Sequence, residues 1–164
     1  MNSAHSSEFR IRPAGVADLE QLLALERRVY PDPWTRGMFL EELSHPGDRN
    51  WLASVPGEGP VGFVIGIDQH DELHIANLAV AVGFRRRGIA RALLERCIQS
   101  GRDRGARDVW LEVRASNSHA LSLYGSAGFQ VIRCRPRYYQ VDDSGEREDA
   151  LVLHRPIHSQ EDSA

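Results

Sequence analysis

The feature of this sequence that most constrains its fold is a strand, helix, strand pattern between residues 72 and 114. Residues 72–80 (ELHIANLAV) and 108–114 (DVWLEVR) have the composition of strands, and residues 88–104 repeat apolar side chains at helical spacing. A helix of this length between two strands predicts a βαβ crossover, whose strands run parallel in one sheet. An α/β fold is therefore expected.

The segments on either side of this crossover complete the predicted order βααβββαβαββ. It implies a mixed sheet of about seven strands with helices on both faces. We expect Thr35 to cap the second helix and Gly128 to end the last one in the left-handed conformation. We also expect a single domain over residues 8–157, with flexible tails over residues 1–7 and 158–164. The other expected strands are 8–14, 50–55, 60–67, 129–139 and 148–156, and the other helices are 17–30, 35–43 and 118–127.

Charge and composition exclude several classes of protein. The chain has 164 residues, with 20 basic and 23 acidic side chains and a net charge of −3, which argues against nonspecific nucleic-acid binding. It has no apolar run near the roughly 18 residues of a membrane span and no secretory signal, so a cytoplasmic protein without a membrane partner is expected. Cys97 and Cys134 match no metal or redox spacing, and His70 and His74 lack a third ligand, so no metal is expected.

The loop before the long helix, VGFRRRGIARALL (residues 82–94), has the composition of a phosphate site. A glycine-containing turn that opens a helix presents unpaired backbone N–H groups and the positive end of the helix dipole. Three consecutive arginines add positive charge, and Gly88 lets a ligand approach the backbone closely. The alternative is a solvated basic turn.

Several motifs together resemble one enzyme family. The spacing Arg85-x-x-Gly88-x-Ala90 resembles the Q/R-x-x-G-x-G/A motif of the GNAT superfamily of N-acetyltransferases, whose loop wraps the pyrophosphate of acetyl-coenzyme A. NLAV, WLEVRASN, ALSLYGSAGF, RPRYY and REDALVL are similar to the RimI-type ribosomal-protein-alanine N-acetyltransferases, from about Pro33 to Pro156. The proline-rich segment 30–33 departs from that subfamily.

The resemblance implies a site for acetyl-coenzyme A. The pantetheine arm is expected to hydrogen-bond to the backbone of a strand that separates from its parallel neighbour, and the pyrophosphate to the loop. Asn117 matches a cofactor-contacting asparagine, although a helix N-cap is an equally natural role, and the strand residues are also ordinary core residues. The expected cofactor residues are Leu78, Ala79, Val80, Arg85, Arg86, Arg87, Gly88, Ile89, Ala90, Arg91 and Asn117.

Two residues are candidates for acid–base chemistry. Strand alternation places Glu112 on the opposite face from the aliphatic residues Leu111 and Val113, where desolvation would make its carboxylate a better base. The resemblance implies that Glu112 is the general base and that Tyr124, twelve residues later, is the acid that protonates the leaving thiolate. The alternatives are that Glu112 pairs with Arg114 or another arginine and that Tyr124 is a core aromatic residue.

Three aromatic residues are candidates for binding the acceptor: Trp34, Tyr138 and Tyr139. Plain packing is the alternative for all three. An acidic cluster in the last hairpin could attract a basic substrate, although a solvated turn is the simpler interpretation. That cluster consists of Asp142, Asp143, Glu146, Glu148 and Asp149.

The sequence thus predicts an enzyme that transfers acetyl from acetyl-coenzyme A to a protein N-terminal α-amine. The resemblance implies the N-terminal alanine of a basic, small-subunit ribosomal protein as the partner. Acetylation of a small-molecule amine or a lysine is the alternative on the same fold. A catalytically silent acyl-coenzyme A binding module is the alternative of a different class.

Overall fold

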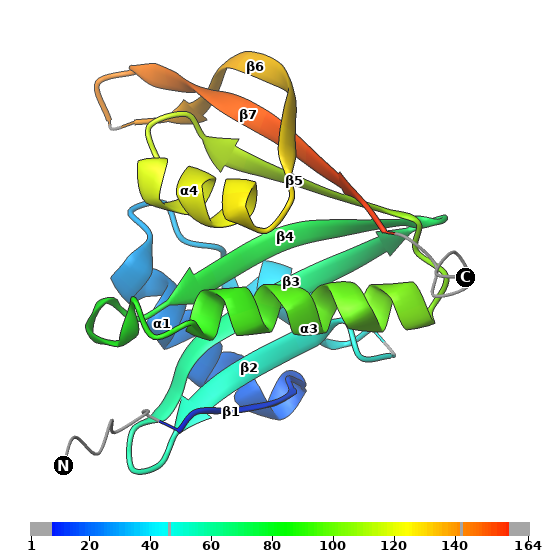
Figure 1. Ribbon diagram of the computed structural model, residues 1–164. Coiled ribbons are helices and arrows are strands. Elements are labelled where there is room, and N and C mark those ends of the chain that lie inside the picture. Colours follow the sequence, from blue (N-terminus) through cyan, green and yellow to red (C-terminus); the bar gives the residue numbers. More distant parts are fainter. Residues whose placement is uncertain (1–7, 46, 142, 158–164) are drawn as a thin grey trace, which may run out of the picture. The chain divides into compact units, whose positions relative to one another are not determined.

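The computed structural model describes residues 8–45, 47–141 and 143–157 and has the predicted element order (Figure 1). In these described residues, two short 3-10 turns, η1 and η2, are the only elements beyond the predicted ones. The predicted tails and Pro46 lie outside the described residues. The elements are β1 (Arg10–Pro13), η1 (Val16–Asp18), α1 (Leu19–Val29), α2 (Arg36–Leu43), β2 (Asn50–Val55), β3 (Gly59–Gln69), β4 (Glu72–Val80), η2 (Val82–Phe84), α3 (Ile89–Asp103), β5 (Asp108–Arg114), α4 (Ser118–Ser126), β6 (Gln130–Gln140) and β7 (Arg147–Pro156).

The seven strands form one mixed sheet in the order β1-β2-β3-β4-β5-β7-β6. β4 and β5 pair in parallel from Glu72↔Asp108 to Ile75↔Leu111, which confirms the predicted crossover through α3. β1–β2, β2–β3, β5–β7 and β6–β7 are antiparallel. The last hairpin therefore places its second strand next to β5 and leaves β6 at the edge.

The contacts divide the chain into two compact units. Unit 1 takes the chain up to Ile67 together with Asn77–Ser100, and unit 2 takes Asp68–Ala76 and the chain from Gly101 onward. Unit 1 thus holds β1, β2, most of β3, the end of β4, α1, α2 and α3 up to Ser100. Unit 2 holds the last residues of β3 and of α3, the start of β4, β5 to β7 and α4.

In unit 1 the helices cover both faces of the strands. Successive residues of a strand face opposite sides, and a Cβ added at Gly62 would lie 3.2 Å from Leu93 of α3, while the ring of Phe63 packs 5.5 Å from that of Phe39 of α2. α3 and α2 therefore lie on opposite faces of β3. The same added Cβ would lie 3.0 Å from the Ala79 carbonyl, so this close approach of β3, β4 and α3 requires glycine.

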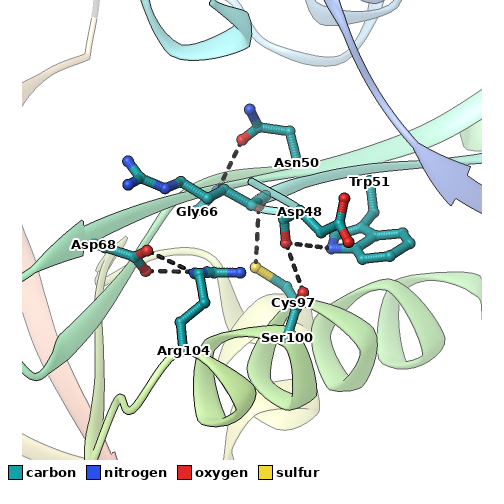
Figure 2. A network of polar contacts seen from close by, with 9 residues as sticks. Asp48, Asn50, Trp51, Gly66, Asp68, Cys97, Ser100 and Arg104 are labelled. Carbon is teal, nitrogen blue, oxygen red and sulfur yellow. Dashed lines mark hydrogen bonds and ion pairs between the residues drawn. The ribbon is translucent and has the colours of Figure 1, made fainter. Parts of the chain in front are cut away.

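A polar network fixes α3 to the loop that precedes β2 (Figure 2). The Asp48 carbonyl accepts hydrogen bonds from Ser100 Oγ at 2.7 Å and from Trp51 Nε1 at 3.1 Å. Cys97 Sγ donates to the Arg49 carbonyl at 3.5 Å. The second half of α3 is thus held in place by main-chain acceptors, which fixes the direction of the helix whose first turn follows the basic loop.

In unit 2 the predicted helix signals are confirmed. Asn117 Oδ1 accepts a hydrogen bond from Ala120 N at 3.1 Å and so caps α4. Gly128 has a φ of +91°, the left-handed conformation expected for the residue that ends this helix. In unit 1, Thr35 Oγ1 likewise accepts from Met38 N at 3.2 Å and caps α2 as predicted.

Candidate active site

The basic loop of unit 1 presents its backbone as an anion site. Arg86 and Gly88 have φ values of +64° and +81°, and left-handed residues next to right-handed ones turn successive N–H groups toward a common point. The first α3 hydrogen bond runs from Ala92 N to the Gly88 carbonyl at 3.0 Å, so the amides of Ile89 and Ala90 precede it. A Cβ on Gly88 would meet nothing within 4 Å. The loop therefore has the open space and the N–H groups that a phosphate requires.

Two of the arginine side chains of this loop contact the loop or the strand end before it. Arg85 Nε donates to the Val80 carbonyl at 3.3 Å, and the Arg87 guanidinium carbon lies 4.9 Å from the centre of the Phe84 ring. These contacts hold the loop in shape. The backbone, more than the side chains, is thus the part of the loop that is arranged for a ligand.

The end of β4 exposes main-chain groups on the side away from β3. Ala81 N donates to the Val61 carbonyl of β3 at 2.8 Å, so the alternation of the strand turns the backbone groups of Leu78 and Val80 the other way. Both carbonyls have donors from side chains: Tyr30 Oη binds the Leu78 carbonyl, and Arg85 Nε binds the Val80 carbonyl. The N–H groups of Leu78 and Val80 point to the same side as these carbonyls.

A buried carboxylate ties α1 to this strand. Glu26 is 1% exposed, and its two oxygens accept hydrogen bonds from Trp34 N at 3.1 Å and from Asn77 Nδ2 at 2.9 Å. Burial raises the pKa of Glu26, and the two hydrogen bonds oppose that rise only in part. The Trp34 ring packs 5.2 Å from the Phe39 ring. The backbone of Trp34 is therefore fixed relative to β4 by Glu26.

In unit 2, Glu112 lies on the polar face of β5. Burial along β5 alternates, with Val109, Leu111 and Val113 buried and the residues between them half-buried, which confirms the predicted alternation. The Glu112 side chain is 29% exposed, and its Oε1 lies 3.2 Å from Arg135 Nη2. The alternative named for Glu112, an ion pair with an arginine, is thus present, and the partner is Arg135 of β6.

A second ion pair lies on the same face. Arg114 Nη1 is 3.1 Å from Glu148 Oε1, and the Arg114 guanidinium carbon lies 4.6 Å from the centre of the Tyr139 ring. Desolvation raises the pKa of Tyr139 to about 12, and the negative charge of Glu112 adds to the rise. Tyr139 is therefore a neutral phenol at physiological pH, in the electrostatic field of Glu112.

The remaining predicted residues are divided between the two units. Tyr124 on α4 is 8% exposed, and its ring packs 5.7 Å from that of Phe129, so it combines the predicted position with the core packing named as its alternative. Tyr138 is 46% exposed, and its ring lies 5.0 Å from that of Tyr139 and 5.6 Å from the Arg135 guanidinium carbon. The tyrosine pair thus belongs to the cluster around Glu112 in unit 2. Trp34 lies in unit 1.

Three polar residues around the site were not predicted from the sequence: Glu26, Tyr30 and Arg135. Glu26 follows Leu22 by four residues and precedes Val29 by three, so helical spacing alone places it on the apolar side of α1. Arg135 gave no such signal, because register shifts occur in β6 between Val131 and Arg133 and again between Arg135 and Tyr139. Tyr30 lies 48 residues from its partner, a distance that no local pattern bridges.

In the part of the chain that the structure describes, no group of three or more His, Cys, Asp or Glu side chains is arranged to hold a metal ion. His74 Nε2 instead lies 3.3 Å from Glu72 Oε2. Within the described residues, no helix has the length and apolar character needed to cross a membrane.

Comparison with known proteins identifies the class. Residues 19–129 match the profile of the Acetyltransferase (GNAT) family. The chain belongs to this family.

Relatives of known activity narrow the class. The chain is 37% identical over 141 residues to ribosomal protein bS18-alanine N-acetyltransferase of Escherichia coli (strain K12), which covers 85% of this chain and 92% of that protein. It is 31% identical over 163 residues to an N-alpha-acetyltransferase of Sulfurisphaera tokodaii, and the match covers 92% of this chain and 94% of that protein. The crystal structure of the ribosomal-protein-S18-alanine N-acetyltransferase from Escherichia coli superposes with a TM-score of 0.83 at 33% identity, covering 96% of this chain and 99% of that one. The chain is thus an acetyl-coenzyme A dependent N-acetyltransferase of the RimI type.

Proposed function

We propose that this enzyme acetylates the N-terminal α-amine of a protein, and that its acceptor is the N-terminal alanine of a small-subunit ribosomal protein. The similarity to the bS18-alanine enzyme over most of both chains supports this acceptor. The observation that carries the chemistry is the position of Glu112, a half-buried carboxylate held beside aromatic and charged side chains on a sheet face. No other class of acceptor is favoured by a specific contact in the described residues.

In this proposal the cofactor binds mainly to the backbone of unit 1. The pyrophosphate meets the N–H groups of the loop from Arg85 to Arg91, where Gly88 leaves open space. The carbonyls of Leu78 and Val80 already have side-chain donors, so the amide carbonyls of the pantetheine arm bind the N–H groups of this strand segment, with Ala79 between them. Asn117 contributes to the cofactor site by holding the first turn of α4.

The proposed reaction is direct attack of the amine on the thioester. The nitrogen forms a bond to the acetyl carbonyl carbon, and the bond from that carbon to sulfur breaks. Glu112 accepts the proton that the nitrogen loses, directly or through one water, and the Tyr124 phenol gives its proton to the leaving thiolate. Solvent then returns a proton from Glu112 to Tyr124. Positioned groups of this kind contribute about 10² to 10⁴ in rate.

An acyl-enzyme route through Cys134 has less support. The thiol is exposed, but local desolvation followed by the nearby carboxylate of Asp149 raises its pKa. A raised thiol pKa lowers the thiolate fraction, and the thiolate is the nucleophilic form. Direct attack remains the simpler mechanism.

The acceptor peptide is proposed to contact Trp34, Tyr138 and Tyr139. Two of the five residues of the acidic cluster have structural partners: Glu148 binds Arg114 and Ser116 N, and Asp149 Oδ1 accepts a hydrogen bond from Arg137 N at 3.0 Å. The Arg114 cation offsets the charge of Glu148, but a backbone N–H does not offset that of Asp149, so among the described residues any attraction for basic substrate residues rests on Asp143, Glu146 and Asp149. Asp142 lies outside the described residues.

The test is a coenzyme A release assay with three acceptors at equal concentration. They are a peptide that begins Ala-Arg and has no lysine, a peptide with a blocked N-terminus and one lysine, and a polyamine. The proposal expects the first peptide to react fastest. Preference for the polyamine would exclude the ribosomal acceptor, preference for the lysine peptide would exclude the N-terminal one, and no turnover with any of them would favour a silent binding module.

A further inference from the structure

We propose that Arg135 is a specificity-determining residue that makes the enzyme select an acceptor amine that is already neutral, and therefore an α-amine over a lysine ε-amine. This inference rests on the proposed function and on Glu112 as the base. It attributes the preference for an α-amine over a lysine ε-amine to one residue of β6, since no motif of the sequence explains that preference.

The geometry places the Arg135 charge directly on the proposed base. Nη2 of Arg135 lies 3.2 Å from Glu112 Oε1, although the two residues are on β6 and β5, with β7 between them. The pairing register sets Arg135 opposite Ala150 and Glu112 opposite Val152. Ala150 is small and fully buried, so the long arginine side chain reaches across β7 above it.

The Arg135 guanidinium also packs against an aromatic ring. Its guanidinium carbon lies 5.6 Å from the centre of the Tyr138 ring, within the range of a cation–π contact. The pair remains partly solvated, with 41% of the Arg135 side chain and 29% of the Glu112 side chain exposed. Such a pair contributes little to folding, so loss of Arg135 is expected to change the electrostatics beside Glu112 more than the stability of the fold.

The other charges on this face do not replace Arg135. On β5, Arg114 is bound by Glu148 of β7 at 3.1 Å and donates to the Gln140 carbonyl at 3.0 Å. On β6, Tyr138 and Tyr139 are phenols, and the raised pKa of Tyr139, about 12, keeps it neutral. Arg135 is thus the cation that contacts Glu112 among the described residues of unit 2.

An amine that approaches Glu112 enters the field of this cation. A protonated ammonium is repelled by the Arg135 charge as it approaches. A neutral amine is not repelled in this way. At pH 7 about a tenth of an α-amine with a pKa near 7.7 to 8.0 is neutral, whereas only about one lysine amine in a few thousand is neutral at a pKa near 10.4. The arginine therefore penalises lysine far more than an N-terminus.

The test measures kcat/KM for two peptides between pH 6.5 and 9.5: the Ala-Arg peptide without lysine, and the N-terminally blocked peptide with one lysine. Arg135→Gln is expected to lower the preference for the α-amine by about tenfold or more, mainly through a higher rate with lysine. Arg135→Lys keeps the charge and should retain the preference to within about threefold. Arg10→Gln is the control, because Arg10 is exposed on β1 in unit 1, and it should leave the preference unchanged.

Different results of this experiment would overturn the role of Arg135 alone or the proposed function as well. A purely structural role for Arg135 would lower both rates in parallel and leave their ratio unchanged, and that result would overturn this inference alone. Loss of the preference in Arg135→Lys as well would also overturn it, since the charge would then not be the cause. If the wild-type enzyme acetylates neither peptide, or prefers lysine, the proposed function falls and this inference falls with it.

Discussion

The groups proposed to function in catalysis and binding differ in kind between the two units of this molecule: main-chain groups in unit 1 and side chains in unit 2. In unit 1 the proposed site consists of main-chain groups: the left-handed loop residue Gly88, the first amides of α3 and the backbone of Leu78 and Val80. In unit 2 it consists of side-chain charges and phenols around Glu112 and Arg135. A main-chain site depends on backbone conformation and tolerates changes of side chain, whereas a side-chain site depends on the identity of each residue. Substitutions should therefore act differently in the two units.

The largest effect is expected for Glu112→Gln in unit 2. Glutamine keeps the size of the side chain and a carbonyl oxygen for Arg135, but it cannot accept the amine proton. We expect kcat to fall by about 10² to 10⁴ in steady-state assays at saturating acetyl-coenzyme A. Glu58→Gln, in the exposed turn between β2 and β3, is the control and should behave as wild type. An unaltered kcat would remove Glu112 from the mechanism and with it the proposed role of unit 2.

The next effect tests whether the buried carboxyl group of Glu26 in unit 1 supports the fold. In Glu26→Gln the amide NH₂ would face one of the two N–H donors, Trp34 N or Asn77 Nδ2. We expect the free energy of unfolding to fall by about 1 to 3 kcal/mol, the cost of leaving a buried donor unsatisfied. Urea unfolding measures it, with the exposed α2 residue Glu41→Gln as the control. A fall in kcat without loss of stability would instead give this side chain a chemical role.

The effect of Glu26→Gln on the free energy of unfolding depends on pH in a defined direction. Burial raises the pKa of Glu26 in the folded state, so folding favours its protonated form. Its contribution to stability is full below the unfolded pKa of about 4.3 and is lost as the pH rises through the folded pKa. The difference in unfolding free energy between wild type and Glu26→Gln should therefore shrink as the pH rises from about 4 toward neutrality. A difference that grows with pH would contradict the direction of this shift.

A moderate effect is expected for Gly88→Ala in the phosphate loop. The new Cβ meets nothing within 4 Å, so the cost comes only from the left-handed φ of +81°, about 1 to 2 kcal/mol for a residue with a side chain. We expect the KM for acetyl-coenzyme A to rise about tenfold while kcat changes little. Gly83→Ala is a matched control, because Gly83 also has open space but no left-handed φ. Equal effects of the two substitutions would show that the loop conformation is not what binds the cofactor.

The smallest effect is expected for Arg87→Gln in the same loop. The Arg87 guanidinium lies over the Phe84 ring and points one nitrogen toward the Gly83 carbonyl at 3.5 Å. Its loss removes one exposed charge and a loop contact but no main-chain donor. The KM for acetyl-coenzyme A should rise less than about threefold, and less than in Gly88→Ala. A larger rise than in Gly88→Ala would reverse the comparison and make the cofactor site a side-chain site.

The sequence predicted the fold well because the elements carry strong local signals. Strands 72–80 and 108–114 have the predicted bounds, the cap at Thr35 forms as expected, and Asn117 takes the N-cap role named as its alternative. The helix predicted to begin at Gly88 begins at Ile89. In each case one residue and its near neighbours determine the structure, so a local pattern is sufficient.

The contacts that support the site could not be predicted, because they join distant segments. The Glu112 to Arg135 pair depends on the two register shifts in β6, and the Tyr30 to Leu78 contact depends on how α1 packs. The face of Glu112 followed from alternation, but its partner did not. The roles of Glu112, Tyr124 and the acceptor residues came from family resemblance and remain predictions.

The most direct test of the difference between the two units is a calorimetric titration of acetyl-coenzyme A into three proteins at one pH: wild type, Glu112→Gln and Gly88→Ala. We expect Glu112→Gln to bind the cofactor within about twofold of wild type, and Gly88→Ala to bind it about tenfold more weakly. The contradicting result is the reverse, with tight binding by Gly88→Ala and weakened binding by Glu112→Gln. That result would mean that the cofactor depends on the side chains of unit 2 and not on the main chain of unit 1.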